Sequence, residues 1–302
     1  MTLLQQSLLD APRRPLLATI GAYVRLTKPR VIELLLVTAV PPMVLAQGGM
    51  PSLWLIAAVV FGGALAAGGA NTINCYIERD RDQLMKRTHG RPLPQGEITP
   101  AHALEFGIGL NVVAFVLLSA TANLLAALLT LSATLFYVFV YTLWLKPRTP
   151  QNIVVGGAAG AVPALVGWAA VRGDLGLAPW LLFAVVFAWT PAHFWALAMK
   201  YRDDYEAAGV PMLPVVAGVA VTTRQIANYA MLTVACTFAL TITGDVGRLY
   251  AVAAFVLGGL FVSRAFALVR DPTPQRAIQF FGWSNVYLML VFVAVAVDTL
   301  VQ

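Results

Sequence analysis

The chain has 302 residues, of which 59% are hydrophobic and only 11% are charged, and its mean hydropathy is +0.77. A soluble domain carries charges on about a quarter of its residues, so the composition excludes an ordinary soluble protein and indicates a polytopic membrane protein. The formal net charge of +6 fits either a nucleic-acid partner or basic loops that orient a membrane protein.

Nine apolar segments along the chain are long enough to cross a bilayer as helices, which needs about 20 mostly apolar residues. We expect the spans at 31–48, 53–74, 101–120, 123–143, 153–171, 178–199, 224–243, 247–268 and 280–300. They predict an all-α membrane protein with nine transmembrane helices around a central cavity that opens to the cytoplasmic side. Residues 1–302 would form a single transmembrane domain, with a cytoplasmic N-terminal arm at 1–20.

Lys and Arg are divided unevenly between the two sets of loops. The N-terminal arm and the loops after the even-numbered spans hold eighteen of the 20, and the other loops hold Arg172 and Arg248. Because basic loops stay cytoplasmic, we expect the N-terminus in the cytoplasm, the C-terminus in the periplasm, and a bacterial inner membrane. A mitochondrial membrane, with the basic loops in the matrix, stays open. The positive charge is thus an orientation signal, which excludes nucleic acid as a partner.

Three side chains with oxygen atoms follow the second span at four-residue intervals: Asn74, Glu78 and Asp82. Each interval turns a helix by about 400°, so the three lie on one side of the helix and Asp80 lies on the other. Mg²⁺ takes one or two carboxylates and completes its shell with water and phosphate oxygens. We therefore predict that these three residues are catalytic and bind Mg²⁺ or Mn²⁺.

Basic residues follow these acids directly and recur in the other loops on the same side. Acids alone would repel a phosphate, whereas acids beside bases form a clamp, in which a cation neutralises the carboxylates and the bases bind phosphate oxygens. The alternative for each base is a role in topology alone. The predicted diphosphate-binding residues are Lys28, Lys86, Arg87, Arg91, Lys146, Arg148, Asn152 and Lys200.

A second acidic group follows the sixth span, in "AHFWALAMKYRDDYEAAGVPMLP" at residues 192–214. His193 lies seven residues before Lys200, about 10 Å inside the membrane edge, and an ionisable residue within a span is a functional candidate. If the helix continued, Asp204 would share the face of His193 and Asp203 would not. All three are catalytic candidates, and an interhelical hydrogen bond is the alternative for His193.

A clamp of this kind at the mouth of an apolar bundle fits an isoprenyl diphosphate, which has a diphosphate head and a hydrocarbon tail. The cation and the bases would stabilise the departing diphosphate as the allylic C–O bond ionises, while apolar walls keep water from the carbocation. Aromatic faces also stabilise cations, although aromatic residues in spans serve packing as well. Those beside the clusters are Tyr76, Phe194, Trp195 and Tyr205.

Three motifs occur in order along the chain. They are "NCYIERDRDQLMKRTHGRPLP" at 74–94, "TPQNIVVGGAAGAVPALVGWAA" at 149–170 and "TPAHFWALAMKYRDDYEAAGVPMLPVVAG" at 190–218. On these motifs, residues 20–300 resemble the UbiA-type intramembrane prenyltransferases, and within them the branch that farnesylates haem. The chain departs from the family pattern at Glu78, where the first motif has an aspartate, and the longer side chain shifts the carboxylate by about one C–C bond.

The resemblance implies a reaction, ligands and partners. The farnesyl group of farnesyl diphosphate would be transferred to the 2-vinyl group of haem b, water would capture the adduct, and diphosphate would leave. His193 would ligate or orient the haem. The expected partners are the two substrates, membrane lipid, and proteins of haem A synthesis or terminal oxidase assembly. The implied metal ligands are Asn74, Glu78 and Asp82, together with Asp203 or Asp204.

Two other functions stay open. One is transfer of a prenyl group to an aromatic acceptor in quinone or chlorophyll synthesis, against which the "HFW" and "GVPMLPVV" matches favour haem. The other is a cation-coupled transporter, which would favour acids near the bilayer midplane and broken helices in paired positions. Here the acids gather at one membrane edge, beside bases that suit a diphosphate better than a transported cation.

Overall fold

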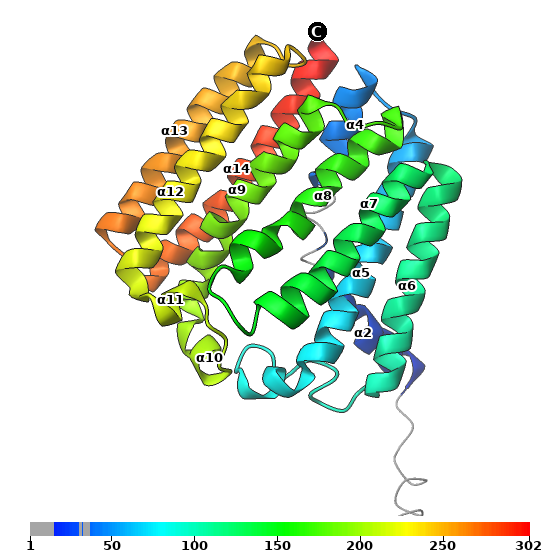
Figure 1. Ribbon diagram of the computed structural model, residues 1–302, viewed down its shortest axis with the longest axis vertical. Helices are drawn as coiled ribbons and strands as arrows, with labels where there is room; N and C mark the ends of the chain where they lie inside the picture. Colours follow the sequence, from blue (N-terminus) through cyan, green and yellow to red (C-terminus); the bar gives the residue numbers. More distant parts are fainter. Residues whose placement is uncertain (1–14, 30–31, 33–36) are drawn as a thin grey trace, which may run out of the picture.

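The chain folds into a bundle of long helices that run side by side along the longest axis of the molecule (Figure 1). The computed structural model describes residues 15–29, 32 and 37–302, and no β-strand occurs in them. Eight helices of this part of the chain are long and apolar enough to cross a membrane. They are α5 (Leu53–Leu84), α6 (Pro100–Thr121), α7 (Leu124–Leu135) with its continuation η1 (Phe136–Leu145), α8 (Asn152–Arg172), α9 (Leu177–Lys200), α12 (Gly218–Ala239) with its continuation η2 (Leu240–Thr243), α13 (Arg248–Arg270) and α14 (Pro274–Val301).

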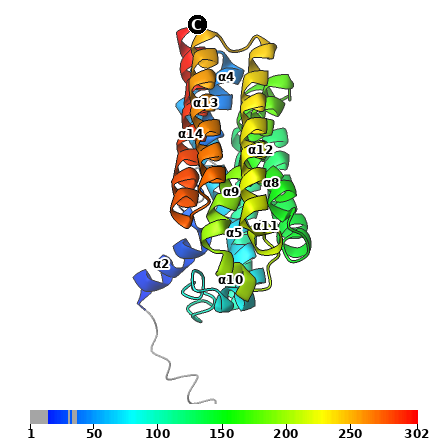
Figure 2. The same ribbon diagram turned by 90° about the vertical axis from the view of Figure 1, so that its left-hand side faces the viewer.

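Shorter helices mark the two ends of the bundle. They are α2 (Leu16–Thr27), α4 (Val40–Gln47), α10 (Arg202–Ala207) and α11 (Leu213–Val216). Figure 1 shows α2, α10, α11 and the loop that follows α5 at one end, and the C-terminus at the other. In Figure 2, α2 lies outside the bundle at the first of these ends. The loops expected to be cytoplasmic therefore meet at one end, which we call the cytoplasmic end after that expectation.

The structure confirms the all-α membrane fold and places a spanning helix on eight of the nine expected segments. The differences lie at the cytoplasmic end, where α5, α12 and α14 extend beyond their apolar segments, because hydropathy reports only the part of a helix that lies in hydrocarbon. The first expected span, 31–48, contains α4, but residues 30–31 and 33–36 lie outside the described part of the chain. Residues 1–14 of the expected N-terminal arm lie outside it too.

Local sequence sets where these long helices begin. Ser52, Thr99 and Thr273 precede α5, α6 and α14, and each side chain accepts a hydrogen bond from a backbone N–H in the first turn. A proline follows both threonines at the first helical position, where its missing N–H needs no partner.

Neighbouring spans pack around the bundle, and α14 packs back against α4 and α9. A close backbone approach between α5 and α6 involves two glycines. A Cβ atom at Gly69 would lie 2.6 Å from the carbonyl oxygen of Gly107, so no larger residue fits there without displacing a helix. Small residues permit this kind of close packing between helices in a membrane.

A buried carboxylate near the end of α14 caps the start of α13. Asp298 is 1% exposed and accepts hydrogen bonds from the backbone N–H groups of Gly247 (2.5 Å) and Tyr250 (3.0 Å). We expect Asp298→Ala to lower the free energy of unfolding by about 1–3 kcal/mol, because buried N–H groups lose their acceptor. The measurement is Tm in detergent, with Asp271→Ala as the control, since Asp271 forms a half-exposed ion pair with Arg276. Equal Tm values for the two variants would contradict the capping role.

Candidate active site

The cytoplasmic end of α5 carries a row of buried polar side chains. Asn74, Glu78 and Asp82 are 2%, 4% and 0% exposed, whereas the side chain of Asp80 is 80% exposed and lies 3.8 Å from Arg79. Residues four apart stack on one face of a helix, and this face of α5 turns into the bundle. The division of the acids into a buried and an exposed face, predicted from their spacing, is confirmed.

Five side chains from α5 and two distant segments form a continuous chain of hydrogen bonds. Lys28 Nζ donates to Asn74 Oδ1 (2.8 Å), and Asn74 Nδ2 donates to Glu78 Oε2 (3.0 Å) and to the hydroxyl of Thr142 (3.2 Å). Lys146 Nζ donates to the same Glu78 oxygen at 2.7 Å. Two of the predicted bases thus reach the polar row of α5: Lys28, from the end of α2, contacts Asn74, and Lys146, from the end of η1, contacts Glu78.

Asp82, one turn further along α5, is held by a different base. Arg91 Nη1 donates to Oδ1 at 2.9 Å and to Oδ2 at 2.7 Å. The Thr88 hydroxyl donates to the backbone carbonyl of Asp82 (3.0 Å). These contacts fold the loop after α5 back over the row of acids, so a third predicted base reaches the site.

The surroundings of these three bases set their charge. Burial alone lowers the pKa of Lys146 and of Arg91, but the carboxylates of Glu78 and Asp82 outweigh it, so both pKa values are raised above their ordinary range. Burial lowers the pKa of Lys28, whose hydrogen-bond partner is an uncharged amide. The site therefore holds two firmly protonated bases against its two buried acids.

The two acid-rich loops meet at the cytoplasmic end. The backbone N–H of Arg87 donates to Asp204 Oδ2 (3.1 Å). The guanidinium of Arg87 donates to the hydroxyl of Tyr205 (3.3 Å) and lies over the ring of Tyr201, 5.1 Å from the ring centroid. Asp203 is exposed and forms no ion pair with a described residue. Of the two adjacent aspartates, Asp204 therefore joins the loop that covers the site.

The sixth span does not continue through the second acidic cluster. Helix α9 ends at Lys200, and Tyr201 (φ −104°, ψ 27°) separates it from α10. The condition for His193 and Asp204 to share a helical face is therefore not met. His193 instead contacts α14, where its Nδ1 lies 2.6 Å from the hydroxyl oxygen of Ser284.

The remaining predicted diphosphate ligands do not contact this chain of hydrogen bonds. Lys86 and Lys200 are exposed, and Arg148 donates to two backbone carbonyls in the last turn of η1. Asn152 is fully buried and its Nδ2 donates to the carbonyl of Thr149 (2.5 Å), while its Oδ1 has no hydrogen-bond partner among the described residues. These four stay predictions without direct contact to the acids.

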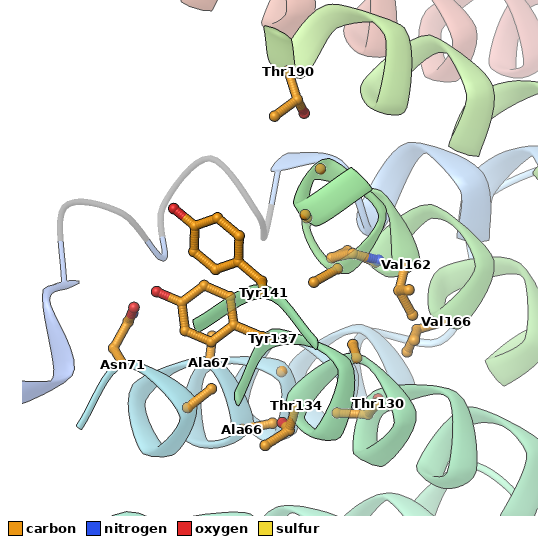
Figure 3. Close-up of a pocket in the computed structure, with 18 of the residues that line it drawn as sticks. Ala66, Ala67, Asn71, Thr130, Thr134, Tyr137, Tyr141, Val162, Val166 and Thr190 are labelled. Carbon is orange, nitrogen blue, oxygen red and sulfur yellow. The ribbon is translucent and has the colours of Figure 1, made fainter. Parts of the chain in front are cut away.

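An apolar cavity of about 290 Å³ lies inside the bundle next to the row of acids (Figure 3). It follows α5 from Val59 to Asn71, a helix length of about 18 Å, so it ends one turn from Asn74. Figure 3 shows Thr190 of α9 on the opposite side of the space from Asn71. Small residues of α5, α7 and α8 make the room: Gly63, Ala66, Ala67, Ala70, Ala133, Gly156, Gly157, Ala159 and Gly160.

Two tyrosines line this cavity because the spanning helix changes its pitch. In η1 the backbone is a π-helix, whose hydrogen bonds join residues five apart, as in the bond from Lys146 N–H to the carbonyl of Tyr141 (2.9 Å). The Thr142 hydroxyl donates to the backbone carbonyl of Tyr137 (2.8 Å). The rings of Tyr137 and Tyr141 stack with centroids 5.3 Å apart beside the cavity (Figure 3). Sequence reasoning missed these tyrosines and Thr142. The available signal was the run "FYVFVYTLWLK" at 136–146, in which a threonine stands among apolar and aromatic residues four positions before Lys146.

The aromatic residues expected to face a carbocation have mixed positions. Phe194 lines the cavity, and Tyr205 hydrogen-bonds to the loop after α5. Tyr76 lies under the guanidinium of Arg79, and Trp195 packs edge-on against Tyr229 of α12. The aromatic wall of the cavity is thus formed by Phe194 and the two tyrosines of η1.

The donor atoms at the mouth of the cavity are of the kind that Mg²⁺ binds. No three Asp, Glu, His or Cys side chains of the described residues lie close enough to enclose a metal by themselves. Two buried carboxylates and one carboxamide oxygen nevertheless share one face, and Mg²⁺ is commonly held by one or two carboxylates plus substrate phosphates. The chemistry of the donors therefore fits a cation that arrives together with a diphosphate.

Comparison with known proteins shows what the whole chain is similar to. Residues 34–292 match the model of the UbiA prenyltransferase family. The chain is 54% identical over 290 residues to a protoheme IX farnesyltransferase of Frankia alni, covering 94% of this chain and 99% of that one. It is 49% identical over 300 residues to a protoheme IX farnesyltransferase of Gloeobacter violaceus, covering 99% and 98%.

Two solved structures share the fold at 18% identity. One is described in a study of digeranylgeranylglyceryl phosphate synthase, with a TM-score of 0.77 over 94% of this chain and 100% of that one. The other is a UbiA homologue from Archaeoglobus fulgidus bound to GPP and Mg²⁺, with a TM-score of 0.63 over 91% and 99%.

Proposed function

The chain belongs to the UbiA prenyltransferase family, and we propose that it transfers the farnesyl group of farnesyl diphosphate to the 2-vinyl group of haem b. The two bacterial relatives described above are protoheme IX farnesyltransferases and match over nearly their whole length. One observation carries the proposal for the site: the buried polar row of α5 contacts three bases at the end of an apolar cavity.

The bases bind the diphosphate head in this account. Lys146 and Arg91 are protonated and already lie beside the carboxylates that the metal would take. When Mg²⁺ is bound with the substrate, it supplies positive charge that stabilises the departing diphosphate. Lys146 and Arg91 then donate to phosphate oxygens instead of to Glu78 and Asp82. Lys28, which donates to Asn74 in this structure, is the third donor to the diphosphate.

The cavity accommodates the hydrocarbon tail and protects the reactive carbon. Its small apolar side chains exclude water around the allylic cation that forms when the C–O bond to diphosphate breaks. The ring faces of Tyr137 and Tyr141 stand beside this space and stabilise positive charge. A new C–C bond then forms between the first farnesyl carbon and the vinyl group, water adds to the resulting cation, and a proton is released.

The finer assignments follow from the same contacts. We propose Asn74, Glu78 and Asp82 as metal ligands, and Asp204 rather than Asp203 for the second cluster, because Asp204 is held against the loop that covers the site. Mn²⁺ would satisfy the same oxygen donors. The basic loops face the cytoplasm of a bacterial inner membrane in this account, with the C-terminus in the periplasm.

The acceptor is tested by competition. Purified full-length protein receives labelled farnesyl diphosphate, Mg²⁺, and equal amounts of haem b and an aromatic quinone precursor. We expect label on haem in the form of a more hydrophobic porphyrin. Label on the aromatic compound would show that this compound, and not haem, is the acceptor. Transfer to neither compound would refute the proposed reaction.

The cavity sets the length of the tail that reacts. Gly160 lines it, and a Cβ atom there would have no neighbour within 4 Å, so Gly160→Leu fills the cavity without a clash at Cβ. We expect kcat/KM for farnesyl diphosphate to fall at least about tenfold, equivalent to ~1.4 kcal/mol, and that for a shorter prenyl diphosphate to fall less. Gly109→Leu is the control, since Gly109 is an exposed helical glycine on α6 with equal space around it. Equal losses with both chain lengths would contradict the placement of the tail.

A further inference from the structure

An arginine on the outer surface of the bundle lies within a membrane span. Arg264 is exposed on α13, six residues before that helix ends at Arg270, which is about 9 Å along the axis. Helices α13 and α14 run side by side at the outside of the bundle (Figure 2). Because α13 is long and apolar enough to cross a membrane, this charge faces the lipid leaflet at the cytoplasmic end rather than the interior of the protein.

A tryptophan of the neighbouring helix holds the guanidinium of Arg264. The guanidinium carbon, Cζ, lies 4.1 Å from the centroid of the ring of Trp283 on α14, within the range at which a cation is attracted to the face of an indole. Trp283 is half-buried and lies nine residues after the start of α14 at Pro274, about 13 Å along the axis. An arginine that only avoided hydrocarbon would extend towards water at the membrane edge, whereas Arg264 reaches sideways to the next helix.

The hydrogen-bond donors of Arg264 have no acceptor in the described part of the protein. Its guanidinium forms no hydrogen bond and no ion pair with a described residue. Asp271, the acid in the turn between α13 and α14, accepts instead from Arg276 Nε at 2.6 Å. Stacking occupies a face of the guanidinium and leaves the N–H groups along its edge free. Because a charged residue within a span is almost always paired, we expect the partner of Arg264 to be an anion from outside the protein.

An apolar surface continues from Arg264 and Trp283 towards the middle of the bilayer. On both helices, exposed aliphatic side chains follow this pair at spacings of three, four, seven or eight residues, which keep them on one face of a helix. They are Leu260 and Val256 on α13, and Val286 and Leu290 on α14. The two helices thus present a cation near the membrane edge and hydrocarbon deeper in the leaflet, which is the order of the parts of an anionic phospholipid.

We propose that Arg264, stacked on Trp283, binds the phosphate of an anionic phospholipid whose acyl chains lie along this aliphatic surface. The planar guanidinium matches paired phosphate oxygens, and basic sites between spanning helices on the cytoplasmic side recognise such head groups. The bound lipid contacts both α13 and α14 and so stabilises their packing. The row of acids lies on α5, and the cavity is lined mainly from α5, α7, η1, α8 and α9, so this site is separate and does not depend on the proposed reaction.

The test measures lipid binding to the purified full-length protein in neutral detergent by native mass spectrometry. Phosphatidylglycerol is compared with phosphatidylcholine of the same acyl chains, whose head group has no net charge. We expect wild-type protein to bind one phosphatidylglycerol at least about fivefold more tightly than phosphatidylcholine, and Arg264→Gln to remove this preference. Arg264→Lys should restore only part of it, because an ammonium lacks the planar fork of donors and stacks less well on an indole. An unchanged preference in Arg264→Gln, or full recovery in Arg264→Lys, would overturn the proposed site.

Matched controls separate this site from a general effect of charge or aromatic surface. Trp283→Leu should weaken the preference for phosphatidylglycerol, because the guanidinium loses the ring that holds it. Trp180→Leu removes an exposed tryptophan of α9, and Arg248→Gln removes the exposed arginine at the other end of α13. Neither should change the preference, and a loss in Arg248→Gln as large as in Arg264→Gln would contradict a specific site.

Two further titrations distinguish the lipid from other anions. Wild-type protein and Arg264→Gln each receive inorganic diphosphate, and separately haem b, whose propionates are carboxylates. We expect both compounds to bind the two proteins equally. Weaker binding of either compound to Arg264→Gln, with unchanged binding of phosphatidylglycerol, would assign Arg264 to a substrate and overturn the lipid site.

Discussion

Replacement of Asp82 by Asn is expected to lower kcat by about 10³-fold or more, because it removes a charged oxygen donor at the point where the diphosphate departs. Asp82 is fully buried on the inward face of α5, and both of its carboxylate oxygens accept a hydrogen bond from Arg91 Nη1. The substitution keeps the shape of the side chain, so most of the packing is retained. The measurement is the single-turnover rate of farnesyl transfer at saturating farnesyl diphosphate and haem.

Asp80→Asn is the matched control for this prediction. Asp80 is two residues away in the same charged sequence, but its side chain is 80% exposed, and a surface substitution changes free energies by less than about 0.5 kcal/mol. We expect its rate within about twofold of wild type. Equal losses in the two variants, at unchanged Tm, would refute the assignment of faces on α5.

Lys146→Met is expected to damage both stability and catalysis, for separable reasons. It leaves the buried carboxylate of Glu78 without its ion-pair partner, and breaking a buried pair costs about 3–5 kcal/mol. It also removes a protonated donor to the diphosphate, which should lower kcat/KM by about 10²- to 10³-fold. Tm in detergent and initial rates at varied farnesyl diphosphate measure the two effects.

The double variant Lys146→Met with Glu78→Gln distinguishes these effects. A neutral amide at position 78 needs no counter-ion, so we expect most of the lost Tm to return. Activity should not return, because neither the base nor the carboxylate is restored. Recovery of activity together with stability would mean that Lys146 and Glu78 serve only to hold α5 against η1.

Helical spacing was enough to predict the acid row but not its surroundings. Asn74, Glu78 and Asp82 lie on one face because α5 stays helical far beyond its apolar part, and a four-residue period is a local property of the chain. Lys28 and Lys146 were predicted as bases on the correct side, from their place at helix ends. Their partners on α5 follow from packing between segments far apart in the sequence.

The features that sequence reasoning missed depend on departures from regular helix. Tyr137, Tyr141 and Thr142 reach the site through the five-residue hydrogen bonds of η1, and no periodicity of an apolar run reveals a π-helix. The end of α9 at Lys200 agrees with the expected span 178–199, but whether the helix continued into the second acidic cluster stayed open, because no glycine or proline marks the break at Tyr201. The fold of the loop after α5 depends on ion pairs such as Arg91 with Asp82, which spacing alone does not fix.

The most direct test of the account is mass spectrometry of the haem after incubation of the purified protein with farnesyl diphosphate and haem b in isotopically labelled water. We predict a haem that gains one farnesyl group and one oxygen atom from the solvent. The product should disappear when a chelator removes the divalent cation and return when Mg²⁺ is added. A product that forms at the same rate in the presence of chelator, or whose added oxygen does not come from water, would contradict metal-assisted ionisation at the mouth of the cavity.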